Sequence, residues 1–249
     1  MNLLLLEPDE LDSSGVVVLR DRRAEHIRKV LRASPEDRLR VGVVNGPRGT
    51  ATVRRIDAAG IELVCALDPA DHGDAPRLDL IIALPRPQTL KKLLLEATSL
   101  GVRRFLFVGG ARTDPSYFQT KVLREDLGRA HRLRGLEQCG ATRLPELTLH
   151  RKLHRLLDDE LDGLLQPGTR RLLLHPGGPP LACAGVTAEP VALAIGPEGG
   201  WLDKEVGRFT DAGFETRGLG GRILRVETAA IAAMAQVQAQ RAQFEERSC

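Results

Sequence analysis

The chain has 249 residues, of which 42% are hydrophobic and only 3% aromatic, and its formal net charge is +3. Its core must therefore consist mainly of Leu, Val, Ile and Ala, and its length allows one large domain or two modest ones. Its cysteines are far apart and include no Cys-x-x-Cys, which argues against a zinc site and against a disulfide-stapled secreted fold. No apolar run has transmembrane length and no signal-peptide pattern opens the chain, so we expect a cytoplasmic protein without membrane association.

The first 70 residues read as a small β-domain. Short strands are predicted at Val16–Leu19, Arg38–Val44, Thr50–Ile56 and Ile61–Leu67. Turn signals at Asn45-Gly46 and Ala59-Gly60 separate them, and a helix over Arg22–Leu31 interrupts the series. Closely spaced short strands of this kind are typical of a small barrel or sheet.

Residues 68–77, which are rich in Pro, Gly and Asp, read as a linker, and the pattern changes after them. Strands are predicted at Leu78–Leu84, Phe105–Val108, Leu147–Leu149, Arg171–Leu174, Val191–Ile195 and Glu215–Leu219. Helices are predicted at Thr89–Leu100 (with Thr89 as N-cap), Phe118–Cys139 (one helix or a pair), Lys152–Leu165, Asp203–Ala212 and Ala229–Ala239. Alternating strands and helices predict an α/β domain with a largely parallel sheet, which binds ligands at the carboxyl ends of its strands.

Two glycine-rich segments follow predicted strands, Ile195–Gly200 and Leu219–Ala229. Glycine at such a junction allows close approach of a ligand to the backbone and a positive φ. Neither segment is the Gly-x-Gly-x-x-Gly of dinucleotide-binding proteins, and no P-loop occurs in the chain. This disfavours a nucleotide-dependent oxidoreductase and indicates a pocket built from backbone loops.

A family resemblance rests on motifs that occur in a fixed order and spacing along nearly the whole chain. They are His26–Arg32, Glu137-Gln-Cys139, Leu174-His-Pro176, Gly196-Pro-Glu-Gly-Gly200 and Leu219-Gly-Gly-Arg-Ile-Leu-Arg-Val-Glu-Thr-Ala229. With these motifs the chain resembles RsmE, the bacterial 16S rRNA uridine-N3 methyltransferases of the SPOUT superfamily. The resemblance implies a PUA-like RNA-binding β-barrel over residues 1–70 and a SPOUT α/β-knot methyltransferase domain over 77–249. It also implies S-adenosylmethionine held in the knot, a homodimer, and 16S rRNA in 30S or pre-30S particles as the partner.

The chain departs from the family pattern at Leu95–Ser99 (at Glu96 and Ser99), at Arg134–Leu136 (at Gly135) and at Ala141, where the family tends to have Arg. These positions lie away from the glycine-rich loops. They leave two alternatives open: a non-catalytic RNA-binding or ribosome-assembly factor on the same fold, and a SPOUT methyltransferase with another RNA target.

Within the resemblance, the loops predict a cofactor site with an apolar slot for adenine. The residues expected to bind S-adenosylmethionine are Leu174, His175, Ile195, Gly196, Pro197, Glu198, Gly199, Gly200, Leu219, Gly220, Ile223, Leu224 and Thr228. For two further side chains, Trp201 and Glu198, the sequence leaves two roles open. Trp201 either stacks on a base or packs beneath the loop, and Glu198 either binds ribose or caps the next helix, where negative charge is favoured.

Uridine N3 carries a proton at neutral pH, so its methylation requires removal of that proton and stabilisation of the resulting anion. Arg222 and Arg225 are the candidates for stabilising the anion or holding a phosphate, and Glu227 for accepting the proton. The alternative for all three is a salt-bridged helix start, with Glu227 paired to Arg225.

The segment 20–40 is rich in basic residues, which outnumber its acidic residues. This excess of positive charge favours contact with RNA phosphates. The residues expected to bind RNA are Arg22, His26, Arg28, Lys29 and Arg32. His150 and His154 have i,i+4 spacing but no third ligand in sequence nearby, so no metal site is predicted.

Overall fold

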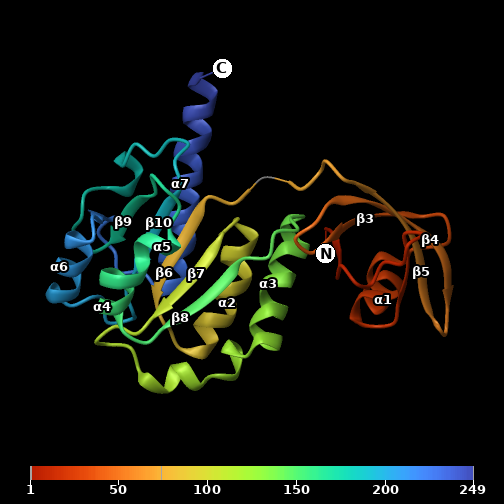
Figure 1. Ribbon diagram of the computed structural model, residues 1–249, viewed down its shortest axis with the longest axis horizontal. Helices are drawn as coiled ribbons and strands as arrows, with labels where there is room; N and C mark the ends of the chain where they lie inside the picture. Colours follow the sequence, from red (N-terminus) through yellow and green to blue (C-terminus); the bar gives the residue numbers. More distant parts are fainter. Residues whose placement is uncertain (1, 74, 249) are drawn as a thin grey trace. The chain divides into compact units, whose positions relative to one another are not determined.

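The computed structural model describes residues 2–73 and 75–248, which divide into two compact units (Figure 1). The amino-terminal unit comprises the chain up to Ala75 together with Leu133–Leu144, and the carboxyl-terminal unit comprises Pro76–Arg132 and the chain from Pro145 onward. Residues 77–249 were predicted to form one uninterrupted domain, whereas Leu133–Leu144 belong to the amino-terminal unit.

The amino-terminal unit is built on a five-stranded curled sheet with strand order β1-β3-β4-β5-β2. Its strands are β1 (Leu4–Leu6), β2 (Val16–Leu19), β3 (Arg38–Val43), β4 (Arg48–Asp57) and β5 (Gly60–Asp68). The pair β1–β3 is parallel and the other pairs are antiparallel. Strand β1 was not predicted, because it is only three residues long and consists of leucine, which does not favour strands as β-branched residues do.

The predicted helix over Arg22–Leu31 has two parts. A short α-helix, α1 (Arg22–His26), is capped by the Asp21 carboxylate, which accepts a 2.9 Å hydrogen bond from the Arg23 backbone N–H. A single π-helical segment follows over Ile27–Leu31 and ends at Arg32, whose φ of 52° is left-handed. Ala24 and Ile27 are buried in the core of the sheet.

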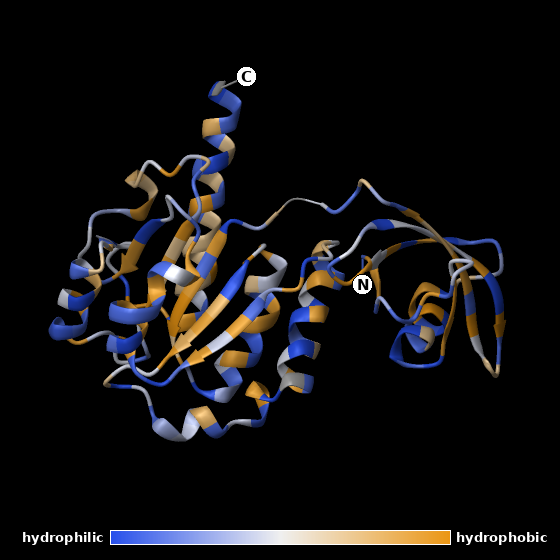
Figure 2. Ribbon diagram, viewed as in Figure 1, coloured by the Kyte–Doolittle hydropathy of each residue, from blue (hydrophilic) through white to orange (hydrophobic). Residues whose placement is uncertain are grey.

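The carboxyl-terminal unit contains a six-stranded sheet with strand order β11-β9-β10-β6-β7-β8, and every described strand pair in it is parallel. Its strands are β6 (Leu78–Ala83), β7 (Arg104–Val108), β8 (Glu146–His150), β9 (Arg170–Leu174), β10 (Val191–Ile195) and β11 (Glu215–Arg217). Figure 2 shows the hydrophobic central strands, and β6 and β10 are buried at every residue. Burial on both faces explains their continuous apolar sequences.

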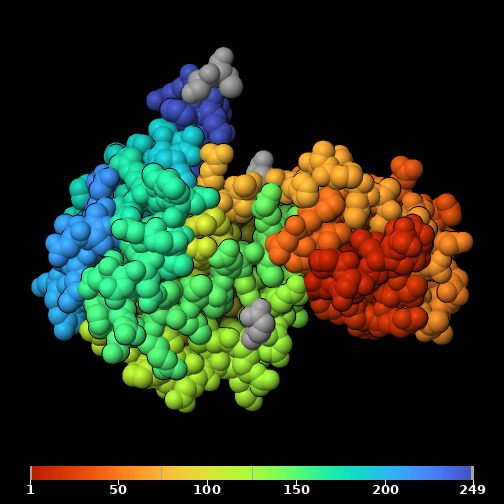
Figure 3. Space-filling view, in the orientation of Figure 1, coloured from red at the N-terminus to blue at the C-terminus, as the bar shows by residue number. Residues whose placement is uncertain are grey.

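Helices cover both faces of this sheet. Helices α2 (Pro87–Ser99) and α7 (Val226–Ser248) pack on the face that carries Leu80 and Ile82. The opposite face is covered by α4 (Leu153–Arg155), a π-helical segment over Leu156–Glu160, α5 (Leu161–Leu164) and α6 (Asp203–Asp211). The last turns of α7 stand out from the rest of this unit (Figure 3).

Two expectations about helices were inaccurate. Helix α2 begins two residues before Thr89, with Arg86 as its N-cap, because Pro87 is well suited to the first helical position. The long helix predicted over Phe118–Cys139 is divided into 3₁₀ turns at Pro115–Gln119 and Lys121–Leu123 and helix α3 (Glu125–Cys139). No helix among residues 2–73 and 75–248 is long and apolar enough to cross a membrane.

The strand order places a topological switch in the carboxyl-terminal unit. From β6 the chain adds β7 and β8 on one side and then returns to form β9, and β10 is inserted between β9 and β6. Open parallel sheets bind ligands outside the carboxyl ends of strands at such a point. The segments that follow β9, β10 and β11 meet there.

Candidate functional site

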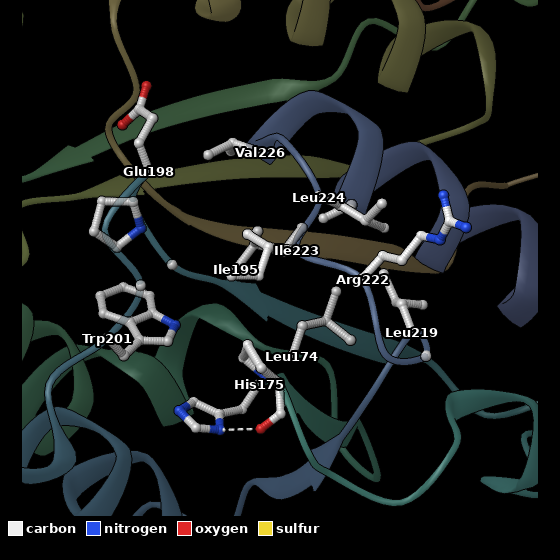
Figure 4. A pocket seen from close by; sticks show the side chains of 16 residues that line it. Leu174, His175, Ile195, Glu198, Trp201, Leu219, Arg222, Ile223, Leu224 and Val226 are labelled. Carbon is white, nitrogen blue, oxygen red and sulfur yellow. Dashed lines mark hydrogen bonds between the residues drawn. The ribbon is translucent and has the colours of Figure 1, made fainter.

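A pocket lies at the carboxyl ends of β9, β10 and β11 (Figure 4). It spans about 680 Å³ of space between protein atoms, and this figure includes open solvent. Its lining residues are Leu174, His175, Pro176, Ile195, Gly196, Pro197, Glu198, Gly200, Trp201, Leu219, Gly220, Arg222, Ile223, Leu224, Val226 and Ala229. The walls are mainly aliphatic side chains and glycine-rich backbone.

The loop after β10 forms a tight turn. The Gly200 N–H donates a 2.8 Å hydrogen bond to the Pro197 carbonyl, and Gly200 has a φ of 74°, a conformation that favours glycine. A Cβ on Gly196 would lie 3.1 Å from the Trp201 backbone nitrogen. The glycines of this loop therefore bring two stretches of backbone together at the edge of the pocket.

The segments after β9 and β11 cross each other closely. The Gly218 N–H donates to the Pro179 carbonyl, and the Leu181 N–H donates to the Gly218 carbonyl. A Cβ on Gly178 would lie 2.8 Å from the Arg217 carbonyl carbon, and one on Gly218 would lie 2.6 Å from the Gly178 oxygen. This backbone crossing fixes His175 on one side and Leu219 on the other.

Glu205 joins the loop after β10 to the loop after β7. Its side chain is buried, with the residue 6% exposed, and it accepts 2.8 Å and 2.7 Å hydrogen bonds from the backbone N–H groups of Leu202 and Ala111. Arg112 adds a second link by donating to the Gly199 carbonyl. These roles of Glu205 and Arg112 were not predicted, because residues 110–112 carry no recognisable motif.

Trp201 packs beneath the loop after β10, which is one of the two roles predicted for it. The residue is 5% exposed, and its ring centroid lies 5.0 Å from that of Phe209. It also lines the pocket, and its buried indole Nε1–H has no hydrogen-bond partner among the described residues. Glu198 does not cap α6; its Oε1 lies 3.4 Å from the Arg86 backbone nitrogen, beside the start of α2.

Most of the residues predicted to bind cofactor line this one pocket, and two do not. Gly199 faces Arg112, whose Cδ would lie 2.9 Å from an added Cβ, and Thr228 is exposed on α7 outside the lining. The prediction omitted Pro176, Trp201, Val226 and Ala229. Pro176, Val226 and Ala229 belong to the quoted motifs, so the motifs alone could have indicated them.

Of the three candidate catalytic residues, Arg222 lines the pocket, whereas Arg225 and Glu227 flank the lining residue Val226. The Arg225 carbonyl accepts a 2.8 Å bond from Ala229, which places Arg225 at the start of α7. None of the three forms an ion pair within the described part of the chain. The salt-bridged helix start is therefore not the arrangement that the structure shows.

The residues predicted to bind RNA lie in the amino-terminal unit, and three of them have partners. Arg22 forms a two-bonded ion pair with Glu137, Lys29 pairs with Glu25 at 2.6 Å, and Arg28 donates to the carbonyls of Asp57 and Gly60. The Nε2 atom of His26 is buried without a partner among the described residues. Arg32 is exposed.

His150 contacts an acid that its sequence neighbourhood did not suggest. Its Nδ1 lies 2.6 Å from Glu160 Oε2, and its Nε2 lies 2.9 Å from Thr148 Oγ1. Both ring nitrogens are thus engaged by protein groups. No cluster of three or more His, Cys, Asp or Glu side chains suited to a metal occurs among the described residues.

Comparison with known proteins identifies the family. A family model described as an RNA methyltransferase domain matches residues 73–238. The ribosomal RNA small subunit methyltransferase E of Treponema pallidum is 31% identical over 244 residues, which cover 96% of this chain and 91% of that protein. The methyltransferase E 1 of Borreliella burgdorferi is 24% identical over 94% of this chain and 95% of its own length.

Among solved structures, the chain is similar to ribosomal RNA small subunit methyltransferase E from Neisseria gonorrhoeae bound to S-adenosyl methionine. The TM-score is 0.77 at 25% identity, and the match covers 97% of this chain and 98% of that one. The predicted fold class, a SPOUT-type α/β-knot domain with a small amino-terminal PUA-like β-barrel, is confirmed by this likeness. The chain therefore belongs to the RNA methyltransferase domain family and, within it, to the ribosomal RNA small subunit methyltransferase E (RsmE) proteins.

Proposed function

We propose that this protein is an enzyme that transfers the methyl group of S-adenosylmethionine to uridine N3 in 16S rRNA of the small ribosomal subunit. The observation that carries the proposal is the pocket at the switch point of the sheet, formed by the three segments that bear the family motifs. Its RsmE relatives are named for methylation of small-subunit ribosomal RNA, and one is solved with the cofactor.

The residues present fit this cofactor. Leu174, Ile195, Leu219 and Leu224 provide an apolar slot for the adenine ring, and backbone groups of the flanking loops can read its polar edge. The unpartnered buried Nε1–H of Trp201 offers one more donor on the wall. A buried donor without an acceptor is unfavourable, so a ligand acceptor there would stabilise both protein and complex.

The bound cofactor supplies an electrophilic methyl group on a cationic sulfur. The task of the protein is to present N3 in line with that methyl and to stabilise the base after its proton leaves. We assign anion stabilisation to Arg222, which lines the pocket, and to Arg225, and proton acceptance to Glu227. Neither arginine forms an ion pair with a carboxylate among the described residues, so neither has to break such a pair before it contacts the substrate.

The partners follow from the same proposal. An N3 atom that is base-paired is inaccessible, so the target uridine must be unpaired or flipped out. We propose a homodimer acting in the cytoplasm on 30S or pre-30S particles, as the family resemblance implies. Ile223, 88% exposed at the mouth of the pocket, supports a further surface closing over this region. Light scattering in solution tests the dimer.

Filling the pocket tests the cofactor site. Ala229→Phe places a large side chain into the lining and is expected to abolish S-adenosylmethionine binding in calorimetric titration. The matched control is Gly207→Ala, because Gly207 lies outside the lining and a Cβ there would meet nothing within 4 Å. Wild-type affinity in Ala229→Phe, with an unchanged melting temperature, would contradict this pocket as the cofactor site. Absence of binding in the wild type would favour the non-catalytic RNA-binding alternative.

Glu205 should act by positioning the loop. Glu205→Gln keeps the size of the side chain but leaves only one acceptor oxygen for two backbone donors, so one buried N–H loses its partner. A buried N–H without a partner costs about 1–3 kcal/mol. We therefore expect cofactor affinity to fall by about tenfold. Titration of Glu205→Gln beside Asp203→Asn, an exposed acid in the same helical turn, checks this. Equal cofactor affinities of the two variants would show that the hydrogen bonds to Glu205 do not shape the pocket.

A further inference from the structure

A second pocket lies wholly within the amino-terminal unit, and none of the predicted RNA-binding residues lines it. We call it the β1–β3 groove. It encloses about 900 Å³, part of it open to solvent, and is lined by Asn2, Leu3, Leu4, Ile27, Leu31, Arg38, Leu39, Arg40 and Cys139. One concave surface is thus formed by strands β1 and β3, the π-helical segment Ile27–Leu31 and the end of α3.

The arginines of this groove differ from most others in the unit. Arg22, Arg23, Arg48, Arg54 and Arg55 form ion pairs with carboxylates, and Arg20 and Arg28 donate to carbonyls. Arg38 and Arg40 are exposed and have no hydrogen bond or ion pair with any described residue. Two residues apart on one strand, they project from the same face of β3 with Cα atoms about 7 Å apart.

Aliphatic side chains back the groove, but most of them are buried. Leu3, Leu4 and Ile27 are buried, and Leu31 is 42% exposed at the rim although it is aliphatic. The neighbouring Arg32, in its left-handed conformation, ends the π-helical segment and also has no side-chain partner among the described residues. The groove thus combines free positive charge with one clearly accessible aliphatic side chain, Leu31.

We propose that the β1–β3 groove binds an unpaired segment of RNA, with Arg38 and Arg40 holding successive phosphates and a base lying against Leu31. Unpaired RNA presents both features that the groove complements, a charged backbone and exposed base faces, whereas duplex RNA hides its bases. The inference rests on the proposed function for the identity of the substrate and moves the principal RNA contact from the helix at residues 22–29 to strand β3.

Charge removal from the groove tests the proposal. The variant is Arg38→Ala with Arg40→Ala, and the matched control is Arg54→Ala with Arg55→Ala, which removes the same charge from the same unit. RNA affinity is measured with a fluorescein-labelled oligouridylate across a salt series. For the groove variant we expect weaker binding and a log–log salt slope shallower by about 0.7 for each phosphate that the variant no longer neutralises. Equal slopes in both double variants would overturn the proposal.

Cys139 provides a second readout on the unmodified chain. The residue is exposed and lines the groove, and partial burial of its thiol raises the pKa of that thiol, so its alkylation should be slow but measurable. Bound oligouridylate should slow alkylation of Cys139 and leave exposed Cys183 unaffected. Equal protection of both thiols, or of neither at saturating RNA, would count against the groove.

The two proposals fail in different ways. If wild-type protein methylates small-subunit RNA while the groove variant binds RNA like the control, only the groove is wrong. If wild-type protein neither binds S-adenosylmethionine nor transfers a methyl group, yet the groove variant binds RNA more weakly than the control, only the proposed enzyme activity is wrong. Thermal melting of both double variants separates a defect in RNA binding from unfolding of the protein.

Discussion

Arg225→Ala is expected to lower methyl transfer to 30S particles by roughly a hundredfold, the usual effect of removing one preorganised charge from a developing anion. Cofactor affinity should stay near wild type, because Arg225 does not line the pocket. Its charge is needed chiefly after the uracil proton has left, so the loss should fall on kcat more than on KM. Single-turnover transfer of a labelled methyl group, beside calorimetric titration, measures both quantities.

Lys204→Ala is the matched control for this experiment, since Lys204 is an exposed cation of the same unit without a partner among the described residues. Arg225→Lys keeps the charge but not the planar fork and should recover part of the rate. Arg222→Ala, assayed in parallel, should reduce cofactor affinity as well, because Arg222 does line the pocket. Normal turnover in Arg225→Ala, or loss explained by unfolding, would make Arg225 a structural residue.

Gly178→Ala is expected to weaken S-adenosylmethionine binding by at least about tenfold and to lower the melting temperature. The added Cβ would lie 2.8 Å from the Arg217 carbonyl carbon and 3.1 Å from its Cα and nitrogen, so backbone rather than a flexible side chain must move. Movement there separates the segments that carry His175 and Leu219, both part of the pocket lining. Calorimetry and thermal melting measure the two effects.

Gly207→Ala serves as its control. A Cβ on Gly207 would meet nothing within 4 Å, and the residue lies inside α6, where alanine is favoured over glycine by about 1 kcal/mol. This variant should bind cofactor normally and melt no lower than wild type. If Gly178→Ala behaves in the same way, the crossing of the two segments is not what holds the pocket in shape.

The sequence by itself determined the local structure and the family. Short β-like runs between turn signals marked β2, β4 and β5, and continuous apolar runs marked the buried strands β6 and β10. The glycine-rich motifs after β10 and β11 indicated the pocket, because a backbone conformation such as that of Gly200 favours one residue type. Signals of this kind arise within a few neighbouring residues, so they can be read without the fold.

The tertiary structure alone decided which of those residues meet. Gly199 was predicted to bind cofactor but lies outside the pocket lining. Trp201 was not in the predicted set but lines the pocket, where it packs against Phe209. The tertiary structure paired Arg22 with Glu137, 115 positions away, and left Arg38 and Arg40 without carboxylates. It also assigned Leu133–Leu144 to the amino-terminal unit. Such contacts join residues that are distant in the chain. The free energy of an ion pair or of a packing contact depends on the distance between the two side chains in space, which composition and spacing do not encode.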